Sequence, residues 1–116
     1  MAEIRGAEEP DTIVVVGAHY DSRSTMSTSP TQRAPGADDN GSGSSALLEF
    51  ARIIQESGVV FRHTLRLCLF TGEEQGLVGS RALAARYAEA GEDVIGMFNT
   101  DMIGYKPPVR VDNLLD

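Results

Sequence analysis

The stretch TIVVVG, residues 12–17, decides the fold, because it is a short, uninterrupted apolar run rich in β-branched side chains. Such a run is typical of a strand buried on both faces of a sheet. Two further apolar runs follow, TLRLCLF at 64–70 and VIGMFN at 94–99. Segments with helical patterns, 42–57 and 80–90, separate the three runs. This alternation predicts an α/β fold, namely a mainly parallel sheet with helices on both faces.

The expected helices carry terminal signals. Ser42 or Ser44 is placed to cap the start of the first helix, and Gly58 follows its end. Ser80 is placed to cap the second helix, and Gly91 lies just beyond it. The polar stretch 18–41, rich in Ser, Thr, Pro and Gly, is too long for an ordinary connection. We therefore expect it to be functional or mobile.

The composition is that of an ordinary globular domain. The chain has 116 residues, a hydrophobic fraction of 41% and a charged fraction of 23%, which suits one domain. Its net charge of -7 argues against a nucleic-acid surface and is read first as solubility, with a cation site as the alternative. No run approaches the roughly 18 apolar residues of a membrane span, and the polar start MAEIRGAEEP is not a signal peptide. Cys68 is expected to be a small buried side chain.

Polar side chains follow each expected strand. His19 comes just after the first strand, the pair Glu73 and Glu74 after the second, and Asp101 after the third. The pair Asp38-Asp39 precedes the first helix. Because the carboxyl ends of parallel strands share one edge with the helix N-termini, we expect these groups to converge on one cleft.

One histidine with several carboxylates suits a divalent cation, zinc first and manganese or cobalt after it. Paired acids also permit a two-metal site. Asp21, two residues after His19, is placed to hold the other imidazole nitrogen. The sequence lacks the lysine of a P-loop and does not fit the G-x-S-x-G pattern, which disfavours a serine nucleophile. The sequon at Asn40 overlaps this polar loop and is expected to be unmodified.

Four stretches, GAHYDS, PGADDNGSG, TGEEQGLVGS and NTDMIGY, resemble in order and spacing the motifs of zinc-dependent aminopeptidases with a co-catalytic metal pair. The resemblance covers residues 13–105. It implies a truncated core of the phosphorylase/hydrolase-like zinc exopeptidase type, with residues 1–116 forming a single, partial catalytic domain. It also implies a peptide substrate, one or two zinc ions and a secreted or vacuolar location.

The resemblance also implies residue roles. His19 and Asp101 bind one zinc ion, Asp39 bridges the two ions, and Glu74 binds the second. Glu73 is then the general base that takes a proton from the water attacking the scissile carbonyl. The family pattern further implies a cis peptide bond between Asp39 and Asn40.

The sequence departs from this pattern in one respect. The family carries a further histidine downstream as the last ligand of the second zinc, and the only other histidine here is His63. His63 opens the second strand, at the edge opposite the cleft. The leading hypothesis is a metallo-aminopeptidase, either a fragment or a reduced form. The alternatives are a weakly active or inactive metal-binding remnant, and a homo-oligomer in which pairing completes or covers the site.

Overall fold

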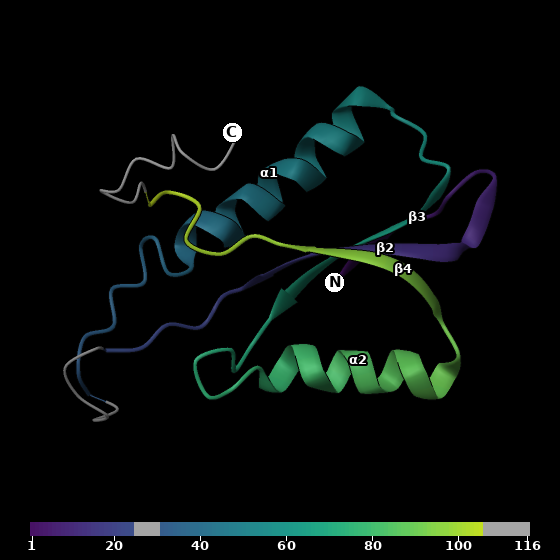
Figure 1. Ribbon diagram of the computed structural model, residues 1–116. Coiled ribbons are helices and arrows are strands. Elements are labelled where there is room, and N and C mark those ends of the chain that lie inside the picture. Colours follow the sequence, from purple (N-terminus) through teal and green to yellow (C-terminus); the bar gives the residue numbers. More distant parts are fainter. Residues whose placement is uncertain (25–30, 106–116) are drawn as a thin grey trace, which may run out of the picture.

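The computed structural model describes residues 1–24 and 31–105, which form a four-stranded sheet with a helix on each face (Figure 1). The strands lie in the order β1-β3-β2-β4. The part of the long polar stretch at 25–30, and the end of the chain from 106, lie outside the described residues. In chain order the elements are β1 (Ala2–Ile4), β2 (Glu9–His19), α1 (Gly41–Ser57), β3 (His63–Phe70), α2 (Val78–Ala90) and β4 (Asp93–Asn99).

The three strands predicted from the apolar runs are present and parallel. β2 lies between β3 and β4 and pairs with both in parallel register. It begins at Glu9, earlier than predicted, and ends at His19 itself. The carboxyl ends of all three strands therefore open onto the same edge of the sheet.

The sheet is mixed rather than purely parallel. β1 pairs with β3 in antiparallel register. This strand is not predicted from the sequence, because three residues are too few to show a periodic pattern. Its pairing is supported by an ion pair of 2.7 Å between Glu3 Oε2 and Arg66 Nε. After β1 the chain stays against β3, where a side chain at Gly6 would lie 2.5 Å from the carbonyl oxygen of Arg62.

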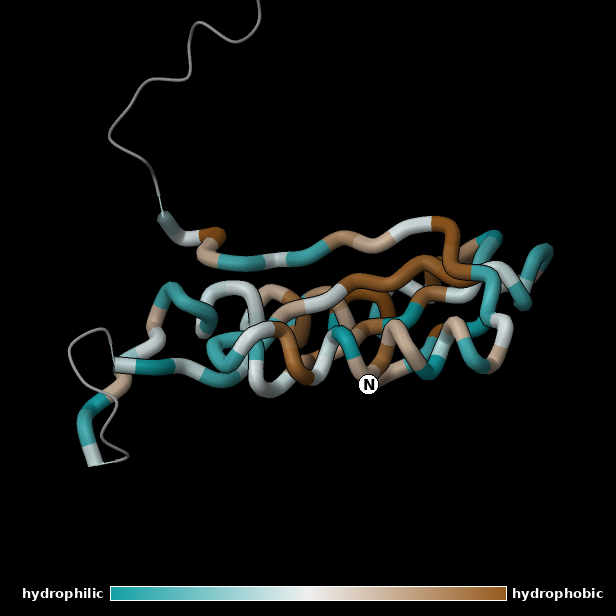
Figure 2. Tube along the Cα trace, turned by 60° about the horizontal axis from the view of Figure 1, so that its bottom comes forward, coloured by the Kyte–Doolittle hydropathy of each residue, from teal (hydrophilic) through white to brown (hydrophobic). Residues whose placement is uncertain are grey.

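The core lies in two layers, one on each side of the sheet. Alternate residues of β2 and β3 point to opposite faces, as in any strand. One face packs Ala18 and Leu67 against Leu47 of α1. The other packs a cluster around Val15 against Leu83 and Tyr87 of α2, the two residues one helical turn apart. Figure 2 shows the most hydrophobic stretches gathered in the middle of the molecule.

The helix N-termini differ from the predictions. Asn40, rather than either serine, caps α1, and its side chain accepts a hydrogen bond from the amide of Gly43. α2 begins at Val78 after Leu77, whose φ of 62° is left-handed, and Ser80 is not its cap. The C-terminal signals are confirmed, because Gly58 and Gly91 both adopt the left-handed conformation that ends a helix.

In the part of the chain that the structure describes, β4 is an edge strand of the sheet. Phe98 is 67% exposed and Ile95 is 56% exposed, although the strand is apolar on both faces. Cys68, by contrast, is buried in the core as predicted. No helix within residues 1–24 and 31–105 is both long enough and apolar enough to cross a membrane.

Candidate metal centre

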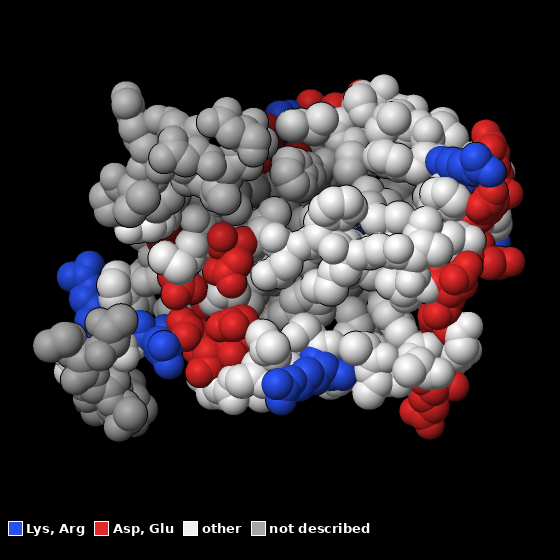
Figure 3. Space-filling view, in the orientation of Figure 1, with Lys and Arg blue, Asp and Glu red and all other residues white. Residues whose placement is uncertain are grey.

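The polar groups predicted to converge come from four separate segments. His19 is the last residue of β2, and Asp101 lies two residues after β4. Asp39 precedes the cap of α1, and Glu73 and Glu74 lie in the turn between β3 and α2. Figure 3 shows acidic side chains gathered at this end of the molecule, where the carboxyl ends of the strands open.

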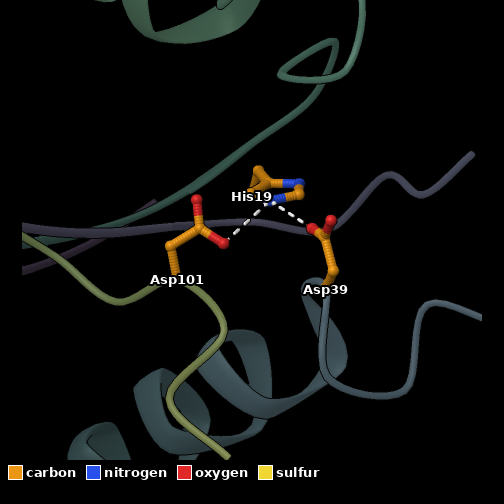
Figure 4. Close-up of side chains that lie close together, drawn as sticks. All are labelled: His19, Asp39 and Asp101. Carbon is orange, nitrogen blue, oxygen red and sulfur yellow. Dashed lines mark ion pairs between the residues drawn. The ribbon is translucent and has the colours of Figure 1, made fainter. Parts of the chain in front are cut away.

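The side chains of His19, Asp39 and Asp101 face one another (Figure 4). The imidazole Nε2 of His19 lies 3.2 Å from Asp39 Oδ1 and 3.5 Å from Asp101 Oδ1. One ligand atom from each residue lies within 4.8 Å of the other two. The imidazole is buried, at 2% exposure, whereas the side chains of Asp39 and Asp101 are 45% and 38% exposed. The group is therefore anchored in the protein and open to solvent on its carboxylate side.

The donor set fits a divalent cation such as zinc. Among the described residues, the buried Nε2 of His19 has no hydrogen-bond partner, although carboxylate oxygens surround it. A buried polar atom without a partner is rare and calls for an explanation. A cation among one imidazole nitrogen and several carboxylate oxygens supplies one, because these are ordinary zinc ligands.

The electrostatics of the group also favour a positive charge. Burial alone lowers the pKa of His19, but the carboxylates of Asp101 and Glu73, the backbone carbonyl of Asp21 and the carboxylate of Asp39 outweigh burial. The pKa of His19 is therefore raised above its ordinary value. A proton and a metal ion compete for the same imidazole lone pair, so the field that retains a proton here also attracts a cation.

Asp21 lies beside His19, as predicted, but its carboxylate has other partners. The Nδ1 atom of His19 is 3.1 Å from the backbone carbonyl oxygen of Asp21 and 3.6 Å from its carboxylate. The carboxylate accepts hydrogen bonds of 3.2 Å from the amides of both Glu73 and Glu74. Burial raises the pKa of Asp21, yet these amides outweigh it, and the pKa is lowered.

Glu73 and Glu74 point to different partners. Glu73 Oε2 lies 3.9 Å from His19 Nε2, so its carboxylate faces the three-residue group. Glu74 is 7% exposed and pairs instead with Arg23, whose Nε lies 2.9 Å from Glu74 Oε2. Burial and the neighbouring carboxylate of Asp39 raise the pKa of Glu74. The structure thus brings Glu73 to the predicted site and places Glu74 beside it, against a guanidinium group.

The peptide bond between Asp39 and Asn40 is cis, which confirms the expectation from the resemblance. His63 lies at the start of β3, at the opposite end of the sheet, with Nδ1 3.3 Å from Glu9 Oε2. It is too distant to serve this group, as predicted. Asn40 is 1% exposed, which accords with an unmodified sequon.

A pocket of about 410 Å³ opens beside the group. Two arginines contribute to it together with two of the acidic residues, and its lining is Arg23, Ser24, Gln32, Arg33, Pro35, Gly36, Ala37, Asp39 and Glu74. Arg23 was not among the predicted site residues. It lies two residues after the H-x-D motif, but its pairing with Glu74 depends on a contact between distant segments.

A histidine and several carboxylates at the carboxyl edge of an α/β sheet are typical of metal-dependent hydrolases. The chain belongs to peptidase family M28, whose model matches residues 1–112. It is 51% identical over 100 residues to leucine aminopeptidase 1 of Arthroderma otae, covering 80% of this chain and 26% of that protein.

Two further proteins similar to this chain are also named as peptidases. The chain is 46% identical over 97 residues to leucine aminopeptidase 1 of Trichophyton rubrum, covering 80% of this chain and 26% of the relative. It is 41% identical over 104 residues to a probable zinc metalloprotease of Leptosphaeria maculans, covering 90% of this chain and 24% of the relative. The chain thus spans about a quarter of the length of these curated relatives.

Proposed function

We propose that this chain carries the catalytic metal centre of a metallo-aminopeptidase that removes N-terminal residues from peptides. One observation carries the proposal. The ligand atoms of His19, Asp39 and Asp101 converge within 4.8 Å, and the carboxylate of Glu73 faces the same space. Membership of family M28 and the names of the relatives support the same reaction class.

His19, Asp39 and Asp101 are the residues that would hold a zinc ion. Asp39 and Glu74 are the candidates for a second ion, with Asp39 shared between the two. When bound, zinc supplies a Lewis acid that polarises the scissile carbonyl and lowers the pKa of a water molecule. The buried imidazole fixes one ligand, and the exposed carboxylates leave the solvent side of the site open to substrate.

Glu73 is the proposed general base. Its carboxylate accepts a proton from the water molecule as the water oxygen attacks the carbonyl carbon of the first peptide bond. The same carboxyl group then donates that proton to the amide nitrogen as the carbon–nitrogen bond breaks, which releases the N-terminal amino acid. The Asp21 carboxylate holds the backbone amides of Glu73 and Glu74, and so helps to fix the direction in which the base points.

The test of this proposal combines zinc content with release of a chromophore from leucine p-nitroanilide. We expect purified protein to contain zinc and to turn the substrate over. Glu73→Gln should retain zinc and lower kcat by about 10²–10⁴-fold, because it removes the proton acceptor. Glu89→Gln, at an exposed position of α2, is the matched control and should behave as wild type. Activity unchanged in Glu73→Gln would overturn the role of the base.

The alternative is a metal-binding domain without turnover. The pairing of Glu74 with Arg23 favours it, since this pairing leaves one complete set of ligands and one partial set. Bound zinc without hydrolysis in the same assay would support this alternative. Absence of zinc binding, even after zinc is added, would exclude both functions and leave only the fold.

A further inference from the structure

Two of the loops that carry proposed ligands are joined by hydrogen bonds between the side chains of one loop and the backbone of the other. The metal loop, residues 38–42, contains Asp39 and leads into α1. The Asp101 loop, residues 100–104, follows β4. These segments are distant in the sequence, and their carboxylates are both more than a third exposed. Few side-chain contacts hold these exposed carboxylates, so the distance between the carboxylates of Asp39 and Asp101 depends mainly on the positions of the two backbone segments.

Asn40 contacts the backbone on both sides of Asp101. Its Nδ2 donates a hydrogen bond of 2.8 Å to the carbonyl oxygen of Thr100, and its Oδ1 accepts one of 3.3 Å from the amide of Met102. The side chain is 1% exposed, so these bonds are shielded from water. The residue next to one proposed ligand thus holds the two peptide groups that flank another.

Two more residues of the metal loop extend this contact. Asp38 Oδ1 accepts a hydrogen bond of 2.9 Å from the amide of Gly104. Ser42 Oγ accepts one of 3.1 Å from the amide of Ile103 and donates one of 2.7 Å to the carbonyl oxygen of Asp38. Residues 38, 40 and 42 alternate along the metal loop, and together they bind three successive amides of the Asp101 loop.

The two loops approach closely at Gly43 and Gly104. A Cβ atom at Gly43 would lie 2.2 Å from the carbonyl oxygen of Thr100 and 2.5 Å from Asn40 Oδ1. A Cβ atom at Gly104 would lie 2.8 Å from Asp38 Oδ1. A larger residue at Gly43 would therefore require a shift of the backbone, whereas one at Gly104 would displace the Asp38 carboxylate from its present position.

We propose that Asp38, Asn40 and Ser42 are positioning residues, a clamp that fixes the carboxylates of Asp39 and Asp101 at the separation needed to share one cation. The inference rests on the proposed function only in taking these two carboxylates as metal ligands. Capping of α1 does not account for the arrangement, because an N-cap needs only the bond from Gly43 to Asn40 Oδ1. The bonds to Thr100 and Met102 serve no purpose in capping.

Asn40→Ser separates the two roles, because serine caps a helix about as well as asparagine but is too short to bridge the loops. We expect this variant to fold, as judged by its thermal melt, and to bind zinc about 10–100-fold more weakly in a chelator competition. The amides of Met102, Ile103 and Gly104 should exchange hydrogen faster than in wild type. Asn40→Asp, which retains both acceptor contacts, should recover part of the affinity. Asn99→Ser, at an exposed position just before the Asp101 loop, is the matched control.

Unchanged zinc affinity in folded Asn40→Ser would overturn the clamp. If Asn40→Ser fails to fold, Asp38→Ala decides instead, with Asp38→Asn as the partner variant that loses the charge but keeps the acceptor. Loss of affinity in Asp38→Ala alone supports the clamp, and equal loss in both attributes the effect to charge and overturns it. Failure of the proposed reaction appears separately, as absence of peptide hydrolysis by zinc-bound wild type, and leaves these binding comparisons intact; a wild type that binds no zinc would overturn the clamp together with the function.

Discussion

Asp21 illustrates how one residue of the site can serve several neighbours. Its backbone carbonyl oxygen lies beside His19 Nδ1, while its carboxylate accepts hydrogen bonds from the amides of Glu73 and Glu74. The first contact orients the imidazole and the second orients the turn that carries the proposed base. The residue spacing H-x-D predicts the first neighbour, because the two residues are close in sequence. It does not predict the second, which depends on how β3 ends beside β2.

Asp21→Ala removes the acceptor for both amides of the turn. We expect zinc affinity to fall by about 10–100-fold, the usual effect of removing a group that supports a ligand. The kcat for leucine p-nitroanilide should fall as well, because Glu73 loses the bond that orients its backbone. Calorimetric zinc titration and steady-state kinetics measure the two effects. Asp11→Ala, an exposed position at the far end of β2, should change neither; equal effects at both positions would assign the loss to net charge.

The ion pair between Arg23 and Glu74 can be tested by substituting the arginine. Its guanidinium pairs with Glu74, but the arginine is 65% exposed, so the pair is worth at most about 1 kcal/mol. Arg23→Ala should free Glu74 and tighten binding of a second zinc equivalent by up to about fivefold. Arg33→Ala removes the same charge from the same pocket and is the control. A second equivalent that tightens equally in both variants would show a general charge effect rather than release of Glu74.

At the scale of elements, the N-terminus of α1 joins the segments of the site. Asn40 binds the Asp101 loop, and Ser44 Oγ donates a hydrogen bond of 2.8 Å to the carbonyl oxygen of His19. The sequence pattern predicted a helix that begins here, but the predicted cap, Ser42 or Ser44, was wrong, since Asn40 is the cap. Both serines have other partners, and such contacts between distant segments cannot be derived from local spacing. The left-handed residue Leu77 before α2 was missed for a different reason, because a leucine rarely adopts a positive φ.

Gly43→Ala tests the close approach of α1 to the Asp101 loop. Alanine in a helix is normally favourable by about 1 kcal/mol relative to glycine. Here its Cβ atom would meet the carbonyl oxygen of Thr100 at 2.2 Å, and such overpacking costs about 1–3 kcal/mol. We therefore expect a lower free energy of unfolding in urea, by roughly 1 kcal/mol. Ser45→Ala, at an exposed position of the same helix, should be neutral or slightly stabilising. A stabilised Gly43→Ala protein would show that the loops separate at little cost.

For the whole molecule, the topology explains why so much of the site could be predicted. Apolar runs locate β2, β3 and β4, and parallel strands bring the residues after them to one edge. His19, Glu73 and Asp101 converge on that basis, and Asp39 joins them because the N-terminus of α1 lies at the same edge. The pairing of Glu74 with Arg23 and the clamp were not predictable, because they depend on side-chain contacts between distant segments, and β1 was not predictable because it is too short to show a pattern. The roles of the site residues themselves stay predictions until metal binding is measured.

The last prediction concerns the stability of the whole chain. Ligands that come from β2, the metal loop and the Asp101 loop meet only in the folded state, so a cation that binds all three must stabilise that state. Free zinc at a hundred times its dissociation constant should contribute about 2.7 kcal/mol and raise Tm by roughly 10 °C, as followed by circular dichroism. A chelator should reverse the shift. His19→Ala removes the buried ligand and should abolish it, because the two remaining carboxylates are each more than a third exposed and hold a cation weakly without the imidazole. A zinc-dependent rise of equal size in His19→Ala would place the stabilising ion elsewhere on this acidic chain.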